Sequence, residues 1–263
     1  MPVPVTPEER RSPLYKYFER DIAPTPPEVV ERVMQGGFDP AGILMPADMD
    51  RLFDDGYLPG EFGWWHLPDG GLMVANHTPM PGVTPEMFDW WFAWHGLNSM
   101  RYKIWDKDDH YYCQTQNPEI SLDSSLSMKE RYWNTVHDIQ EALMPGQEPV
   151  GVRLNFVPPQ VVGFDPERLR DFKGTIVCTP GPGAIMVHFV RPTAEGCELR
   201  TRFWMGYQAV DGKPVRISEF PAVDMAAKAM LIHNVKEYTH LAKILPEVYA
   251  EFKDDFTVEP MKR

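Results

Sequence analysis

The sequence predicts an α+β fold in which an antiparallel sheet is covered by a long C-terminal helix. Four runs rich in β-branched or alternating residues follow one another after Gly151, and Gly, Pro or charged residues bound each of them. The segment 225–241 then contains neither Gly nor Pro and reads as a helix. Strands followed by a helix favour an α+β arrangement. In such an arrangement, a cavity between sheet and helix is a common ligand site.

Composition indicates a folded globular protein. The chain has 263 residues, of which 43% are hydrophobic and 24% charged, enough for one large domain or a domain with a smaller companion. Its 27 prolines predict many turns and argue against a simple helix bundle. Turn residues cluster at Pro79, Pro81 and Gly82. We therefore expect an N-terminal Pro/Gly-rich subregion over residues 1–80 and the main domain over residues 81–263.

Charge and cysteine content exclude several classes of function. The net charge of −12 disfavours binding to a phosphate backbone, so no nucleic-acid partner is expected. The chain has no apolar run long enough for a membrane span, and its N-terminus lacks the apolar core of a signal peptide. Three cysteines without a CxxC pair fit the reducing cytoplasm, so a metal would need His and carboxylate ligands. The aromatic content is compatible with a homodimer.

The N-terminal half carries several helix signals. Residues 27–35 start at a proline and stop before a glycine pair, and a second short helix is predicted from Pro46. Thr84 is a candidate N-cap for an aromatic helix that starts at Pro85. Residues 101–112 read as extended and lead into a loop, and residues 127–145 as helical or irregular. Three tryptophans of the aromatic helix either pack in the core or wall a pocket: Trp90, Trp91 and Trp94.

The run at 197–207 is the clearest strand. Its alternation predicts one apolar face and one largely wet face, as in an antiparallel sheet. The long helix is expected over about 221–242, with a break at 245–247 and a short final helix through Phe252. On the strand, the expected apolar face carries Cys197, Leu199, Thr201, Phe203, Met205 and Tyr207, and the expected wet face carries Glu198, Arg200 and Arg202.

His233 and Glu237 are the leading candidates for a functional pair. They stand four residues apart on the predicted C-terminal helix, so their side chains share one face. An imidazole and a carboxylate at that spacing can hold one divalent metal ion. A solvated His–Glu pair is the ordinary alternative at such a position.

Other histidines have weaker claims on a metal. His110 follows the acidic residues Asp106, Asp108 and Asp109 in a predicted loop. His188 lies in an apolar strand, where burial of an unpaired imidazole is costly, and a hydrogen-bonded core histidine is the simpler interpretation. His240 lies near the His233 face of the helix, either supporting it or exposed.

Several of these segments carry a family resemblance. The segments RYKIWDKDDH and HNVKEYTHLAKILPEVYAEF, together with RFWMGY between them, resemble the 2,4-diacetylphloroglucinol hydrolase and phloretin hydrolase family. The resemblance covers most of the chain, from about Trp64 to Phe252. It implies a zinc-dependent hydrolase that breaks the carbon–carbon bond between an acyl group and a phenolic ring. It also implies a Bet v 1-like helix-grip catalytic domain over residues 81–263.

The resemblance also implies particular zinc ligands. His110, His233 and Glu237 match three ligand positions, and Glu141 is the best match for the fourth. The sequence around Glu141 departs from the family pattern, so Asp138 and Glu130 stay open as alternatives. Tyr102 matches a tyrosine that contacts substrate hydroxyls, and His188 and Tyr207 match a pocket histidine and tyrosine. Cys113 replaces a substrate-contacting asparagine, which leaves the particular substrate open.

The implied chemistry is acyl transfer to water. A bound Zn²⁺ would polarise the acyl carbonyl of a small aromatic ketone. The departing ring carbon needs a proton, which His188 or Glu141 would supply. Two alternatives remain: a metal-free helix-grip module that binds a hydrophobic or aromatic ligand, and a zinc hydrolase of another acyl, ester or β-diketone substrate.

Overall fold

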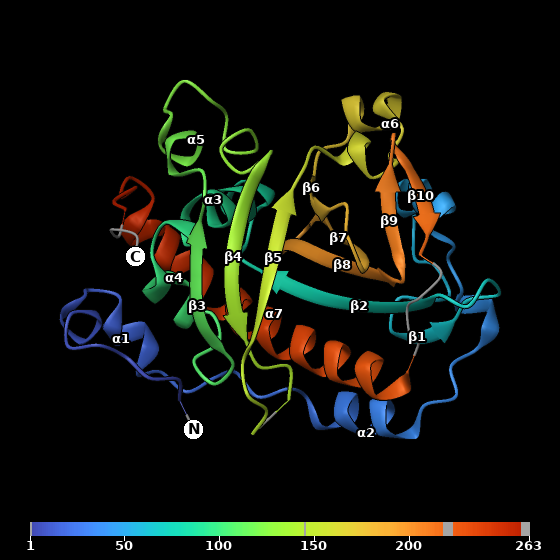
Figure 1. The fold of residues 1–263 in the computed structure, drawn as a ribbon, viewed down its shortest axis with the longest axis horizontal. Coiled ribbons are helices and arrows are strands. Elements are labelled where there is room, and N and C mark those ends of the chain that lie inside the picture. The colour runs from blue at the N-terminus through green and yellow to red at the C-terminus, as the bar shows by residue number, and fades with distance from the viewer. Residues whose placement is uncertain (1, 145, 218–222, 259–263) are drawn as a thin grey trace.

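The computed structural model describes residues 2–144, 146–217 and 223–258 (Figure 1). The strands are β1 Gly63–His66, β2 Leu72–Pro81, β3 His110–Thr115, β4 Thr135–Glu141, β5 Val150–Phe156, β6 Thr175–Thr179, β7 Ala184–Thr193, β8 Gly196–Met205, β9 Tyr207–Val210 and β10 Lys213–Arg216. The α-helices are α1 Tyr15–Phe18, α2 Pro27–Gln35, α3 Pro85–Trp94, α4 Ser99–Lys103, α5 Pro118–Leu122, α6 Pro166–Asp171 and α7 Asp224–Phe252. Short 3₁₀ helices cover Glu9–Arg11, Pro40–Gly42, Pro46–Phe53, His95–Leu97 and Pro159–Val161.

Antiparallel sheets and a long C-terminal helix confirm the α+β prediction. The main sheet has the order β1-β2-β8-β7-β6, and a second sheet has the order β3-β4-β5. A single bridge between Val157 and Cys178 connects the end of β5 to β6. Helix α7 runs along β2 and passes behind β4 and β5 in the view of Figure 1. The two sheets therefore wrap around one side of α7.

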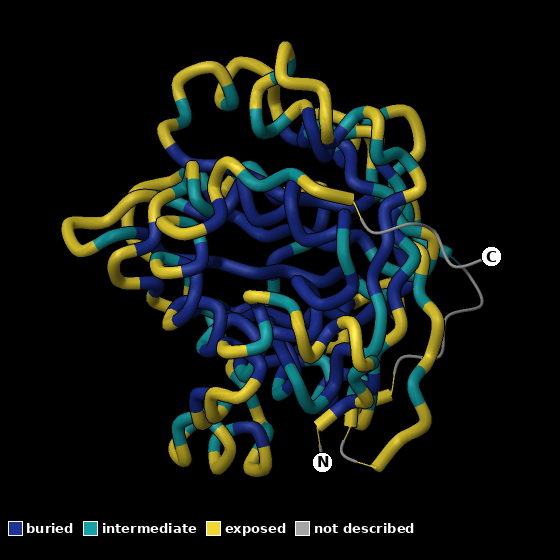
Figure 2. The backbone as a smooth tube through the Cα atoms, turned by 90° about the vertical axis from the view of Figure 1, so that its left-hand side faces the viewer, coloured by how far each residue is buried: buried dark blue, intermediate teal, exposed yellow. Residues whose placement is uncertain are grey.

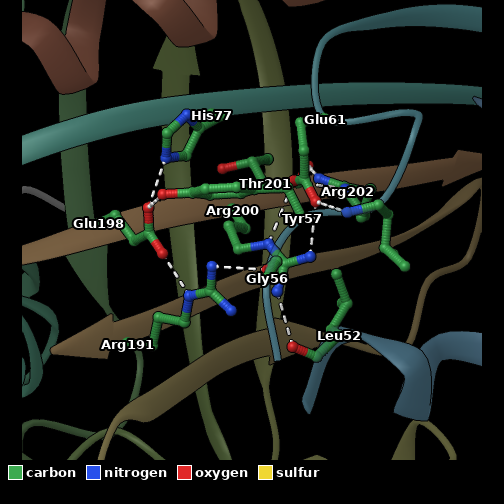
Figure 3. A network of polar contacts seen from close by, with 11 residues as sticks. Leu52, Gly56, Tyr57, Glu61, His77, Arg191, Glu198, Arg200, Thr201 and Arg202 are labelled. Carbon is green, nitrogen blue, oxygen red and sulfur yellow. Dashed lines mark hydrogen bonds and ion pairs between the residues drawn. The ribbon is translucent and has the colours of Figure 1, made fainter. Parts of the chain in front are cut away.

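The main sheet is buried on both faces, so the prediction that one face of β8 is exposed to solvent is wrong. Glu198, Arg200 and Arg202 are at most 4% exposed. The N-terminal segment, residues 44–61, covers them. Within it, the carboxylate of Glu61 accepts hydrogen bonds from both arginines (Figure 3). Tyr57 of the same segment donates to Glu198. The burial of the central strands is plain in Figure 2.

Two cores lie on opposite faces of this sheet. The core beside α7 contains the aromatic helix α3, whose N-cap is Thr84 as predicted. Trp90, Trp91 and Trp94 pack in this core and do not line the cavity described below. The other core lies between the sheet and the N-terminal segment and includes Trp204.

Helix α7 extends beyond the predicted break. It continues through Pro246 to Phe252 as one helix, whereas the predicted long helix ends at about residue 242. Proline removes one backbone hydrogen bond, but Leu245, Val248 and Phe252 are buried and hold this last part of the helix against the core. Residues 221 and 222 of the predicted helix lie outside the described residues.

Two further predictions of local structure are wrong in part. Residues 101–103 belong to α4, so the segment predicted to be extended over 101–112 becomes a strand only from His110. Residues 135–141 form strand β4 within the stretch predicted to be helical or irregular. The proposed boundary at residue 80 stays a prediction. Strands β1 and β2 pair within the same sheet as β8, so residues 63–81 are structurally continuous with the main domain.

Candidate metal centre and its cavity

Helix α7 presents His233 and Glu237 toward strand β3. Both side chains are buried, with exposures of 4% and 8%. The Oε2 atom of Glu237 lies 3.6 Å from Nε2 of His110, the first residue of β3. Potential ligand atoms of these three residues lie within 4.8 Å of one another. The helical pair and the distant histidine are therefore brought together.

Strand pairing brings Glu141 to the same place. His110 on β3 is the register partner of Glu141 on β4, and Glu141 Oε2 lies 3.9 Å from His233 Nε2. Side chains alternate along a strand, so Asp138 faces the other way and forms an ion pair with Arg153. Glu130 precedes β4 and accepts hydrogen bonds from Ser127 instead. Among these three acids, only Glu141 lines the cavity.

Tyr102 orders two of the candidate ligands. Its hydroxyl donates to Glu141 Oε2 at 2.6 Å, and its ring stacks on the His110 imidazole with centroids 3.8 Å apart. Its carbonyl oxygen lies 3.1 Å from His110 Nδ1, which must donate there. That fixes the tautomer and leaves the lone pair on His110 Nε2, a buried atom without a hydrogen-bond partner among the described residues.

The pKa shifts in the site reflect burial together with neighbouring negative charge. Burial raises the pKa of Glu237 to about 8, with His233 opposing the shift and Glu141 adding to it. Burial disfavours charged His233, but the Asp109 contact and the charges of Glu237 and Glu141 prevail and raise its pKa to about 9. Carboxylates that crowd together in this way favour a bound cation. The orphaned His110 nitrogen and this charge fit a divalent metal ion.

Three of the four candidate ligands line a cavity of about 220 Å³ between the sheets and α7, and His110 lies beside them without lining it. Tyr102, Glu141, His188, His233 and Glu237 all line it. Its remaining wall is mainly apolar and aromatic, which suits a flat aromatic molecule. The apolar wall includes Phe92, Trp105, Ile139, Leu154, Phe156, Met186, Phe203 and Tyr238.

His188 lies in this cavity as a neutral group. Its Nδ1 atom is 2.9 Å from the Thr201 hydroxyl oxygen. Burial lowers its pKa to about 3, so it is uncharged at neutral pH.

Tyr207 is placed elsewhere. Its hydroxyl donates to Asp69, and its ring packs in the core on the opposite face of the sheet. The alternation of β8 does not reach it because Gly206, with φ of +84°, ends the strand after Met205. The role predicted for Tyr207 at substrate hydroxyls is therefore not supported by its position.

Two histidines of the cavity wall carry no distinguishing signal in the sequence. His95 and His137 lie with ring centroids 5.2 Å apart, and the His137 Nδ1 atom is 3.9 Å from the Cys113 sulfur. His137 belongs to β4 and points to the same side as Glu141. A strand predicted over residues 135–141 would place His137 on the same face as Glu141, because side chains alternate along a strand.

Comparison with known proteins identifies the family. Residues 44–250 match the family model described as the DAPG hydrolase PhiG domain. A phloretin hydrolase of Eubacterium ramulus is 37% identical over 97% of this chain and 95% of its own length. The chain belongs to the DAPG hydrolase family. It is an enzyme, a hydrolase acting on carbon–carbon bonds in ketonic substances.

A more distant relative also matches most of the chain. A 2,4-diacetylphloroglucinol hydrolase of Pseudomonas protegens is 26% identical to this DAPG hydrolase family member, over 92% of this chain and 85% of its own length. The solution structure of KanY protein aligns with a TM-score of 0.36 and 13% identity, covering 67% of this chain and 98% of that one.

Within the described residues, none of the helices has the length and apolar character needed to cross a bilayer.

Proposed function

We propose that this hydrolase uses zinc to cleave the bond between an acyl group and a phloroglucinol-type phenolic ring, releasing a carboxylic acid. The observation that carries the proposal is that Glu141, His233 and Glu237 line one cavity, with His110 3.6 Å from Glu237. Two relatives are named for the hydrolysis of phloretin and of 2,4-diacetylphloroglucinol. We expect a small aromatic ketone of this class as the substrate.

The donor set suits zinc. Two imidazoles and two carboxylates are ligands that Zn²⁺ accepts, and the Tyr102 contacts hold one of each kind in place. When bound, Zn²⁺ would supply Lewis-acid polarisation of the acyl carbonyl and activation of water.

The protein's own groups would bind and orient the ring. Apolar walls exclude water and sandwich the aromatic ring. Neutral His188 is suited to hydrogen bonding with a phenolic hydroxyl, since burial opposes its imidazolium form. The short Tyr102–Glu141 hydrogen bond holds a proton beside the cavity, so this pair is the better candidate for protonating the ring carbon as it leaves.

We also propose that the fold is a Bet v 1-like helix-grip domain. The wrapping of both sheets around α7, with a ligand-sized cavity between them, supports this. The cytoplasmic location and the homodimer expected from the sequence stay predictions.

Metal analysis and product identification test the function together. We expect about one zinc per chain, and a carboxylic acid product from phloretin or from 2,4-diacetylphloroglucinol. His233→Ala and Glu237→Ala should each remove both zinc and hydrolysis. His66→Ala serves as the control, because His66 forms an exposed ion pair with Asp224.

Two results would contradict the proposal. Full hydrolysis by the His233 and Glu237 variants would exclude these ligands. A folded, metal-free protein that binds the ketone without turnover would instead favour the binding module. If other acyl compounds or β-diketones turn over and both phenolic ketones do not, the metal centre stands and the substrate assignment fails.

A further inference from the structure

We propose that Asp109, held by Lys236, is a positioning residue that fixes the orientation and tautomer of His233 at the metal centre. This inference rests on the proposed function, because it assigns a role around one of its candidate ligands. Asp109 and Lys236 do not line the cavity. They therefore act through His233 rather than on the substrate.

The two nitrogens of His233 face different carboxylates. Nδ1 lies 3.5 Å from Asp109 Oδ2, and Nε2 lies 3.9 Å from Glu141 Oε2. A proton on Nδ1 directed at Asp109 leaves the lone pair of Nε2 facing the candidate metal centre. The Asp109 contact is longer than a formed hydrogen bond, so a small turn of the imidazole is needed to close it.

Lys236 holds Asp109 in place. Its ammonium donates a hydrogen bond to Asp109 Oδ2 and lies 2.9 Å from Asp106 Oδ2. Asp106 is fully buried and Asp109 is 5% exposed. The ammonium offsets the repulsion between these two acids and occupies the space between them. Their carboxylates are thereby kept in position beside His233.

The same lysine connects the two halves of the metal centre. Lys236 lies on α7 between His233 and Glu237, while the two aspartates form the turn that leads into His110. Within that turn, the backbone N–H groups of Asp109 and His110 both donate to the carbonyl of Asp106. Lys236 therefore ties the strand half of the site to the helix half.

Zinc affinity in competition with a chromophoric chelator is the primary measurement. We expect Asp109→Asn and Lys236→Met to weaken zinc binding by about 10- to 100-fold, the usual cost of losing an outer partner of a ligating histidine. Lys236→Arg keeps the charge and should recover most of the affinity. Asp108→Asn is the matched control, since Asp108 lies in the same turn but has no ion pair with His233 or Lys236.

The cobalt-substituted protein gives a second readout that a general loss of stability would not produce. We expect Asp109→Asn to shift the Co²⁺ visible absorption bands, whereas Asp108→Asn leaves them unchanged. Denaturant unfolding of the metal-free variants shows whether each is folded, and the comparison of Lys236→Met with Lys236→Arg tests the idea if Asp109→Asn does not fold.

The outcomes separate this inference from the proposed function. Wild-type zinc affinity together with a wild-type Co²⁺ spectrum in Asp109→Asn would overturn the positioning role and leave the metal centre standing. Equal losses in Asp108→Asn and Asp109→Asn would also overturn it. A wild-type protein that binds no zinc would overturn both proposals.

Discussion

At the scale of single residues, the wall beside the candidate centre depends on close packing around His137. A Cβ atom at Gly96 would lie 2.4 Å from Cε1 of the His137 ring, closer than carbon atoms approach. Glycine at 96 therefore lets the 3₁₀ turn after α3 come up against this imidazole. His137 is 1% exposed and lines the cavity, so the cavity is where its ring has room to move.

We expect Gly96→Ala to displace the His137 ring into the cavity. Hydrolysis should fall through a raised KM, because the cavity wall moves while the candidate ligands stay in place. Stability should fall by about 1–3 kcal/mol, as is usual for overpacking in a core. Steady-state kinetics and urea unfolding check both effects.

Gly151→Ala is the matched control, because a Cβ atom there meets nothing within 4 Å. Wild-type KM and stability in Gly96→Ala would show that the wall adapts without cost.

At the scale of elements, the sequence predicted the helices and strands whose hydrophobic pattern reflects burial against a core. The aromatic helix, the strands after Gly151 and the helix that carries His233 and Glu237 are all present. Strand β4 was missed because its cavity-facing positions include His137 and Glu141, and polar residues that face a cavity do not produce an apolar alternation. The pairing of His110 with Glu141 depended on that strand, so the sequence alone left the fourth ligand open.

The alternation of side chains along β4 distinguishes the acids that are candidates for the fourth metal ligand. We expect Glu141→Gln to reduce bound zinc and hydrolysis strongly, since a neutral amide is a poorer zinc ligand than a carboxylate. Asp138→Asn should keep both, because Asp138 faces outward and pairs with Arg153 at the surface, where an ion pair contributes at most about 1 kcal/mol. Zinc content per chain and initial rates measured side by side decide between them.

The assignment of the fourth ligand would fail if Asp138→Asn lost zinc while Glu141→Gln retained it. Glu130→Gln completes the comparison and should resemble wild type, because its carboxylate caps the turn at Ser127.

At the scale of the whole molecule, the N-terminal segment closes the outer face of the main sheet. Glu61 binds Arg200 and Arg202 together, and Arg200 also donates to the Leu52 carbonyl (Figure 3). The alternation along β8 could indicate which residues share a face, but not that a segment more than a hundred residues earlier covers that face. Charged residues on a strand are typical of a solvated surface, and only the tertiary pairing with Glu61 allows their burial.

This pairing makes the stability of the whole molecule depend on acid pH. Burial would raise the pKa of Glu61, but the hydrogen bonds and charges of Arg200 and Arg202 outweigh it and lower the value to about 2. A carboxyl with a lowered pKa in the folded state stabilises the protein above its unfolded pKa of about 4.3. That contribution, about 3 kcal/mol at neutral pH, is lost as the pH falls from about 4.3 toward 2.

We therefore expect Glu61→Gln to cost about 3 kcal/mol at pH 7, since it leaves two buried guanidinium groups without their counter-charge. Because Gln does not titrate, the difference in unfolding free energy between wild type and variant should shrink as the pH falls and be small near pH 2. Urea unfolding at a series of pH values measures this difference, with the exposed Glu28→Gln as control. A difference that stayed constant down to pH 2 would mean that the paired charges of Glu61 do not hold the N-terminal segment on the sheet.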